Sequence, residues 1–94
     1  MHVVVRTYSG EGASALFDLL EQRVDEVKEI MTSVPGFHSY VAFRHNGGGI
    51  TVTTCNDKAG TDESSSRAAE WVRNNVTATI SAPSITEGDT SLQF

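Results

Sequence analysis

The chain has 94 residues, a formal net charge of −5 and a single cysteine. A chain of this length forms one small domain, residues 1–94, whose large exposed surface favours oligomerisation. The acidic balance, without a basic run or a basic helix face, argues against a nucleic-acid or anionic-membrane surface. No apolar run approaches the roughly 20 residues that cross a bilayer, and no signal-peptide pattern is present. One cysteine excludes an internal disulfide and zinc spacing, so we expect a cytoplasmic, reducing setting.

The first third of the chain predicts a strand followed by one long helix. His2–Tyr8 is a run rich in β-branched residues, and residues 9–12 break it. Residues 13–34 carry apolar side chains at helical spacing, which predicts an amphipathic helix of about five to six turns. Pro35 and Gly36 end this helix, because proline disfavours helix in the preceding residue and glycine tolerates the exit turn. The apolar positions are Leu16, Leu19, Leu20, Val24, Val27, Ile30 and Met31.

Residues 37–56 predict a β-hairpin with two unlike faces. The runs 37–44 and 50–55 flank residues 46–49, whose glycines supply the positive φ angles of a tight reversal. Successive side chains of a strand point to opposite faces, so one face is apolar and the other carries hydrogen-bonding groups. The apolar set is Phe37, Val41, Phe43, Ile50 and Val52, and the polar set is His38, Tyr40, Arg44, Thr51, Thr53 and Cys55.

The remainder predicts a second helix and a last strand. Residues 57–75 favour a helix in two parts, with Asp57 capping the first turn and a second start after Gly60. Small residues line one face of it, which permits close packing on a sheet. Residues 77–84 connect it to residues 90–94, which alternate like a strand.

The predicted order, β-α-β-β-α-β, gives an α+β, ferredoxin-like fold: a four-stranded antiparallel sheet with two helices on one face. We expect the apolar side chains to face the helices. These are Val3, Val5, Val41, Phe43, Ile50, Val52, Leu92 and Phe94. The mixed, polar face is then free of helices, and pairing it with a second sheet explains its composition. That face comprises Val4, Arg6, Tyr8, His38, Tyr40, Arg44, Thr51, Thr53, Cys55, Ser91 and Gln93.

Three segments make the chain resemble the dimeric α+β barrel superfamily, and within it the antibiotic biosynthesis monooxygenase-like group. They are the helix exit 34–40, the glycine-rich hairpin, and residues 68–72 with Trp71. The resemblance implies that two protomers pack sheet against sheet, with a cavity on the helix-free side of each. It also implies cofactor-independent oxidation of phenols in some relatives and opening of a haem ring in others. Haem-degrading relatives use a first-strand asparagine and, in the second helix, a tryptophan and a histidine. Trp71 is the counterpart of the tryptophan, but this chain lacks the other two, so we expect neither haem degradation nor a cofactor.

Two side chains of the polar face are candidates for catalysis. His38 and Tyr40 lie two residues apart, so their side chains can converge on one ligand. A histidine of near-neutral pKa can take a phenolic proton, and the resulting phenolate is electron-rich enough to attack oxygen. The alternative is that both side chains serve a subunit contact through their amphipathic tips.

The same face offers candidate substrate-binding residues. Two arginines at an enclosed site favour a carboxylate or enolate, although salt bridges to acidic residues, within or between protomers, are the alternative. Trp71 either stacks on a bound aromatic or caps the core between helix and sheet. Cys55 is an inert packing residue, and no metal-ligand spacing occurs. The candidate set is Arg6, Tyr8, Arg44, Thr51, Thr53 and Trp71.

Two functions follow from the residues and the resemblance together. The first is a homodimer that binds a small aromatic compound on its helix-free sheet face and oxidises it without a cofactor, with His38 as base, Arg6 or Arg44 steadying an oxyanion and Trp71 stacking. The second is a non-catalytic dimer that binds a small molecule or forms an assembly, in which the polar face is interface.

Overall fold

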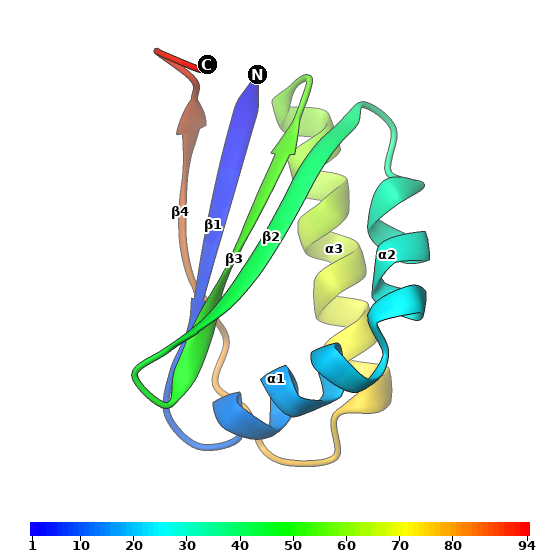
Figure 1. The fold of residues 1–94 in the computed structure, drawn as a ribbon, viewed down its shortest axis with the longest axis vertical. Coiled ribbons are helices and arrows are strands. Elements are labelled where there is room, and N and C mark those ends of the chain that lie inside the picture. Colours follow the sequence, from blue (N-terminus) through cyan, green and yellow to red (C-terminus); the bar gives the residue numbers. More distant parts are fainter.

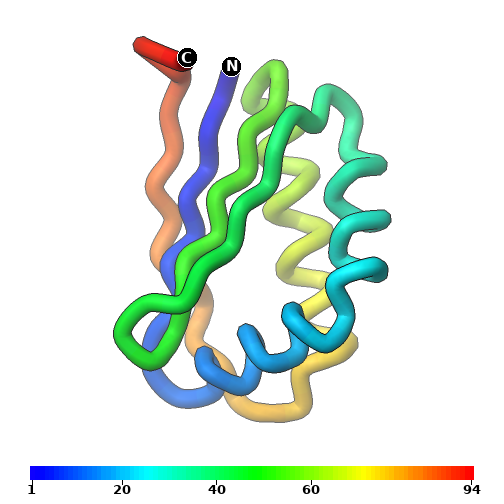
Figure 2. The backbone as a smooth tube through the Cα atoms, viewed as in Figure 1, coloured from blue at the N-terminus to red at the C-terminus, as the bar shows by residue number.

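A computed structural model describes residues 1–94 as one antiparallel sheet with helices on one side (Figure 1). The strand order is β2-β3-β1-β4, and the two chain ends lie side by side (Figure 2). This confirms the predicted ferredoxin-like α+β fold, with three helices where two were expected. No helix combines the length and the hydropathy that crossing a membrane requires. The elements are β1 (His2–Tyr8), α1 (Ala13–Gln22), α2 (Val24–Thr32), β2 (Phe37–His45), β3 (Gly48–Cys55), α3 (Lys58–Asn75) and β4 (Ser84–Asp89).

The first predicted helix is broken at Arg23. This residue has φ −117° and ψ 39°, outside the helical region, so α1 ends and α2 begins on either side of it. Figure 1 shows α1 beneath the sheet and α2 standing alongside α3, so the two helices run in different directions. The predicted second helix is instead continuous, and the Asp57 side chain accepts a hydrogen bond from the Gly60 amide at 3.1 Å, as its capping role requires.

The assignment of the two sheet faces was wrong. The face that meets the helices carries His2, Val4, Arg6 and Tyr8 of β1, all of which are buried. This face packs against small polar side chains of α3: the Arg6 guanidinium donates hydrogen bonds to the hydroxyls of Ser64 and Ser65. Hydroxyl-bearing residues on α3 therefore pack against the hydroxyl-bearing side of β3. The predicted alternation holds from Tyr40 onward in the hairpin, but the covered side is the more polar one.

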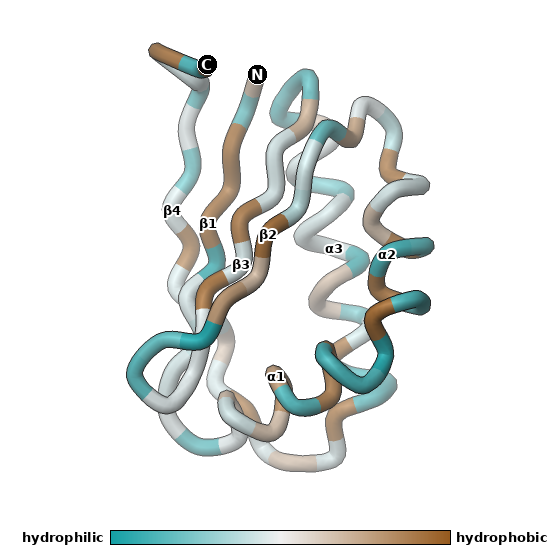
Figure 3. The backbone as a smooth tube through the Cα atoms, viewed as in Figure 1, coloured by the Kyte–Doolittle hydropathy of each residue, from teal (hydrophilic) through white to brown (hydrophobic).

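The helix-free face is correspondingly the apolar one. Val41 and Phe43 of β2 are 54% and 47% exposed, and the register places them opposite Val52 and Ile50 of β3. Brown segments recur on β1, β2 and β3 in Figure 3, whereas β4 is mostly teal and white. Val3 and Val5 of β1 complete this outer apolar face, which we define as Val3, Val5, Val41, Phe43, Ile50 and Val52.

A β-bulge near the start of β2 reverses the side-chain alternation there. Phe37 pairs with Cys55 and Ser39 with Thr54, so His38 is an extra residue without a partner on β3. Phe37 consequently lies on the helix side together with Tyr40, although the two are an odd number of residues apart. Phe37 was predicted to share a face with Val41 and Phe43, and the bulge is why it does not.

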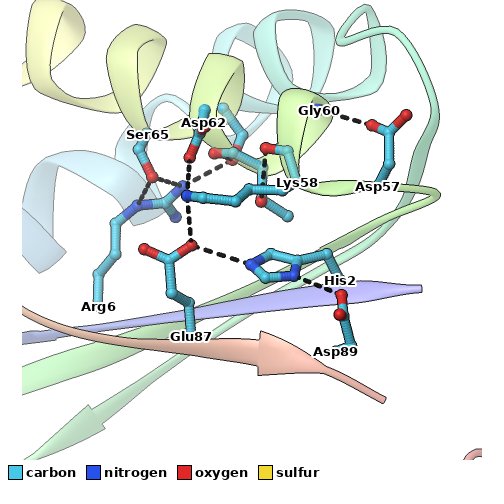
Figure 4. Close-up of polar contacts among 11 residues, drawn as sticks. His2, Arg6, Asp57, Lys58, Gly60, Asp62, Ser65, Glu87 and Asp89 are labelled. Carbon is cyan, nitrogen blue, oxygen red and sulfur yellow. Dashed lines mark hydrogen bonds and ion pairs between the residues drawn. The ribbon is translucent and has the colours of Figure 1, made fainter.

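The last strand is β4, Ser84–Asp89, which corrects its prediction at residues 90–94. Its sequence has little strand propensity, and it pairs antiparallel with the edge of β1. Polar side chains add to the backbone pairing: His2 Nδ1 lies 2.8 Å from Asp89 Oδ1 and Nε2 lies 2.9 Å from Glu87 Oε1 (Figure 4). Lys58 of α3 reaches the same Glu87 at 3.1 Å. Leu92 and Phe94, expected to face the helices, are instead exposed.

The compact core lies where α1 and α3 meet β1. Its buried members are Tyr8, Ala13, Leu16, Phe17 and Trp71. Tyr8 and Phe17 pack edge to face with ring centroids 6.2 Å apart. This cluster fixes one end of the helical layer on the sheet, while α2 stands farther along beside β2.

Candidate functional site

A cleft of about 600 Å³ opens between β2 and the α1–α2 pair. Its volume is within the roughly 300–1,000 Å³ that small-molecule sites occupy, and most of its lining is apolar. The break at Arg23 matters here, because it lets α1 and α2 line two sides of the space. The lining residues are Phe17, Leu20, Glu21, Val24, Val27, Lys28, Met31, Thr32, Phe37, Ser39, Tyr40, Ala42, Phe43 and Arg44.

A small cavity of about 30 Å³ adjoins the inner end of the cleft. Leu20, Val27, Met31 and Tyr40 line both spaces. The side chains that close it from the sheet and from α3 include Tyr8, Thr51, Ala68 and Trp71. The cavity behind the cleft therefore has an aromatic and hydroxyl-bearing wall.

An ion-paired arginine closes one end of the cleft. Arg44 Nη2 donates to Asp18 Oδ1 at 2.6 Å and Arg44 Nε to Glu21 Oε2 at 2.8 Å, both across from β2 to α1. The bond from Arg44 holds the pKa of the Glu21 carboxyl below its usual value. The salt-bridge alternative considered for Arg44 is therefore the arrangement present, within one protomer. Because all three groups are substantially exposed, the pairing fixes geometry more than it stabilises the fold.

Tyr40 is the polar group placed deepest in the cleft. Burial, followed by the neighbouring Tyr8, raises the pKa of the Tyr40 phenol to about 12. The phenol is thus neutral at physiological pH and retains its proton. Tyr40 therefore presents a hydrogen-bond donor to a bound oxygen atom and does not act as a base there.

Trp71 lies at the inner end with its indole already bonded. It is 7% exposed, and its Nε1 donates to Glu26 Oε1 of α2 at 2.8 Å. The Asn75 side chain bonds the Trp71 carbonyl at 2.9 Å. Trp71 thus joins α3 to α2 and at the same time gives the small cavity an aromatic wall. This position is compatible with both roles predicted for Trp71, stacking on a bound aromatic compound and capping the core between helix and sheet.

Arg6 lies under α3, away from the cleft, and its charge has no carboxylate partner. It is 1% exposed. Its guanidinium donates to Thr53 at 3.0 Å and Ser64 at 2.7 Å, and also to Thr51 and Ser65. Burial lowers the pKa of Arg6 from its usual value, as expected for a cation surrounded by neutral groups. Arg6 and Arg44 share a sheet face as predicted, but they occupy separate surroundings.

The structure brings together only part of the predicted site. Tyr40 and Arg44 line the cleft, and Tyr8, Thr51 and Trp71 line its inner cavity. Thr53 is buried against Arg6. His38 is exposed on the bulge and lines none of the described spaces, so it does not converge with Tyr40.

Residues of α1 and α2 that sequence reasoning assigned to a core turn out to form half of the cleft. Leu20, Val24, Val27 and Met31 line it. No signal of this division is present in the sequence, because the apolar positions between residues 16 and 31 recur at the spacing of one face of a single straight helix.

Comparison with solved structures shows which proteins share this fold. MhuD, a heme-degrader from Mycobacterium tuberculosis, matches with a TM-score of 0.69 and 16% identity over 100% of this chain and 99% of that chain. A protein of unknown function from Nitrosomonas europaea matches with a TM-score of 0.68 and 19% identity, over 99% and 90% of the two chains. SnoaB, a cofactor-independent oxygenase from Streptomyces nogalater, gives a TM-score of 0.53 and 16% identity, over 99% and 92%. No family model and no curated protein matches the chain.

These likenesses confirm the ferredoxin-like α+β fold predicted from the sequence. At such identities they carry the fold and not the chemistry. The ligand cavity was expected on the helix-free side of the sheet. Within one protomer, the space suited to a small molecule instead lies between the sheet and the helices.

Proposed function

We propose that the chain is a homodimer that binds a small aromatic phenol or quinone in the cleft between β2 and the α1–α2 pair. The observation that carries this is the cleft itself: about 600 Å³, largely apolar, and ending at Tyr40 and Trp71. A planar aromatic compound matches such a lining through burial of its rings, while its oxygen substituents need few polar partners. The fold shared with a heme-degrader and with a cofactor-independent oxygenase supports a ligand of this kind.

The reaction that suits the site is oxidation by O₂ without a cofactor, as in the neighbour SnoaB. The substrate supplies all four electrons: one oxygen atom enters the product and the other leaves as water. In this account Tyr40 donates its phenolic proton in a hydrogen bond to the substrate oxygen, where negative charge develops. The cationic residue Lys28, at the cleft lining and outside every ion pair of the chain, attracts an anionic substrate.

Haem, which MhuD degrades, does not match the donor atoms of this cleft. None of the three histidines of the chain lines the cleft or its inner cavity. Tyr40 offers a phenol that burial keeps protonated, with its pKa raised to about 12, which makes it a poor iron ligand. Glu21 is held by Arg44.

A second candidate function, a binding protein without catalysis, is favoured by the lack of a base. Glu21 is the one carboxylate in the lining, and Arg44 lowers its pKa and so its basicity. His38, the base predicted from the sequence, lies elsewhere. Catalysis in this cleft consequently requires a phenol acidic enough to ionise without help from the protein, and measurement of O₂ uptake separates the two functions.

The outer apolar face supports dimer formation. A continuous row of valine, isoleucine and phenylalanine side chains across three strands, exposed on β2 and half-buried on β1 and β3, is uncommon on a protein that remains monomeric. A second copy of the same face is an occupant of matching shape and polarity, and the pairing buries apolar surface that a chain of 94 residues cannot bury alone. The helix-free face of the sheet thus remains the proposed dimer interface. Its contacts are between apolar side chains and not the arginine salt bridges considered from the sequence.

Trp71 is the only tryptophan, so its fluorescence reports directly on the inner end of the cleft. We expect naphthol to change this fluorescence saturably in the wild type. Ala42→Phe places a ring in the cleft lining and should weaken binding at least about tenfold. Ala15→Phe, at an exposed α1 position outside every described pocket, is the matched control and should bind as the wild type does.

Loss of binding in both variants, or in neither, contradicts the cleft as the site. Oxygen uptake with anthrone and with acidic phenols then tests the chemistry. Uptake that Ala42→Phe abolishes and Ala15→Phe retains supports the oxygenase. Saturable binding with no uptake above the uncatalysed rate supports the non-catalytic binding protein.

A further inference from the structure

The positive charges of the chain are unevenly partnered. Of its five arginines, three pair with carboxylates: Arg23 with Glu26, Arg44 with Asp18 and Glu21, and Arg67 with Glu63. The other two, Arg6 and Arg73, form no ion pair, although the chain has 12 acidic residues. Both line the same pocket.

This pocket has a volume of about 370 Å³ and lies between α3, the β1–β4 side of the sheet and residues 80–83. Arg6, Arg73 and Ser65 give it a cationic, hydroxyl-bearing side, and no aspartate or glutamate lines it. Val72, Ile80 and Ile85 give it an apolar wall. It shares no lining residue with the cleft described above, and it shares only Tyr8 and Val72 with the small cavity that adjoins the cleft.

The hydrogen bonds of Arg6 direct a donor into this pocket. Its guanidinium N–H groups donate hydrogen bonds to four hydroxyl oxygens. Two of these bonds go to the Ser65 oxygen, at 3.3 Å and 3.0 Å (Figure 4). Ser65 accepts both bonds, and no group of the chain accepts the proton of its own hydroxyl. That proton is therefore free to bond a ligand, and the cation behind it strengthens it as a donor.

A buried guanidinium surrounded only by neutral hydroxyls lacks the counter-charge that such a group ordinarily has. An anion in the pocket supplies that counter-charge without displacing any of the existing bonds. Arg73, whose side chain is exposed, can close over the ligand with its planar fork of donors, which matches a carboxylate.

We infer that this pocket binds a small organic carboxylate with an apolar body: its carboxylate bonds Ser65 and Arg73 in front of Arg6, and its hydrocarbon part lies on Val72, Ile80 and Ile85. A carboxylate matches the pocket better than an inorganic phosphate does, because one free arginine and one hydroxyl offer few donors and the remaining wall is apolar.

Isothermal titration calorimetry of the full chain with hexanoate, hexanamide and inorganic phosphate tests this inference. Hexanoate should bind with an affinity that falls as salt is raised, and hexanamide should bind at least about tenfold more weakly. Arg73→Gln and Ser65→Ala should each weaken hexanoate binding at least about tenfold. Arg23→Gln, which removes another exposed arginine outside this pocket, is the control and should leave hexanoate binding unchanged.

Equal affinity for hexanoate and hexanamide, or equal loss in Arg73→Gln and Arg23→Gln, overturns the inference. Tighter binding of phosphate than of hexanoate also overturns the assignment to carboxylates. The melting temperature of each variant without ligand shows whether a loss of binding reflects unfolding. The Ala42→Phe variant should bind hexanoate normally, so failure of this pocket and failure of the cleft are distinguishable.

Discussion

Gly49→Ala tests how α1 is held on the sheet. A Cβ at Gly49 would overlap the Phe17 ring, because it would lie only 2.6 Å from the Cε1 atom of that ring. Phe17 is 2% exposed and packs edge to face on Tyr8, so its ring can make room for the added methyl group only by giving up part of this contact. Overpacking of this kind costs about 1–3 kcal/mol. Each kcal/mol lowers the melting temperature of a domain of this size by about 4–8 °C.

Gly88→Ala is the matched control, because it also adds one methyl group to a strand of the same sheet. No atom lies within 4 Å of its Cβ, so we expect stability within about 0.5 kcal/mol of the wild type. Urea unfolding of both variants measures the difference. Phe17→Leu in the Gly49→Ala background should recover stability, with a coupling energy of about 1 kcal/mol or more. Equal stability of Gly49→Ala and Gly88→Ala, or strictly additive effects in the cycle, would refute the close packing of Phe17 on β3.

Three further predictions follow from other contacts. The hydrogen bonds of His2 with two carboxylates raise the pKa of its imidazole. The stabilisation that these bonds give should therefore be complete below pH 6.5 and lost as the pH rises through the raised pKa. His2→Gln should flatten this part of a profile of melting temperature against pH. Val41→Asp should shift sedimentation from dimer to monomer while Ser66→Asp, at an exposed position of α3, does not, and a dimer that persists in Val41→Asp contradicts the interface. Glu26→Ala should cost about 1 kcal/mol and alter Trp71 emission, whereas Glu26→Gln keeps an acceptor and should retain most of the stability; equal losses would show that the Trp71 bond contributes nothing.

The fold was predictable because local pattern and turn chemistry agree with it. The strand at residues 2–8, the hairpin and the Asp57 cap follow from β-branched runs, glycines and one carboxylate, each a local signal. The division of the hairpin into two faces was predictable from Val41 onward for the same reason. Which face of the sheet the helices cover is not a local property, because it depends on the helix surface that packs on it. Here the side of α3 that carries Ser64 and Ser65 bonds Arg6 on the polar face of the sheet.

The candidate site was predicted only in part, for identifiable physical reasons. The bulge at His38 is a backbone irregularity with no sequence signature, and it removes His38 from Tyr40. The strand β4 was misplaced because its pairing with β1 depends on long-range contacts, such as that of His2 with Glu87, rather than on propensity.

An NMR titration of ¹⁵N-labelled protein with naphthol tests the central claim, that the ligand site is the cleft on the helix side of the sheet. We predict that the amide signals of Val27, Met31 and Ala42, which line the cleft, shift progressively and saturably as naphthol is added. Shifts confined to Val5 and Val52 of the outer apolar face, with these three unchanged, would contradict the account.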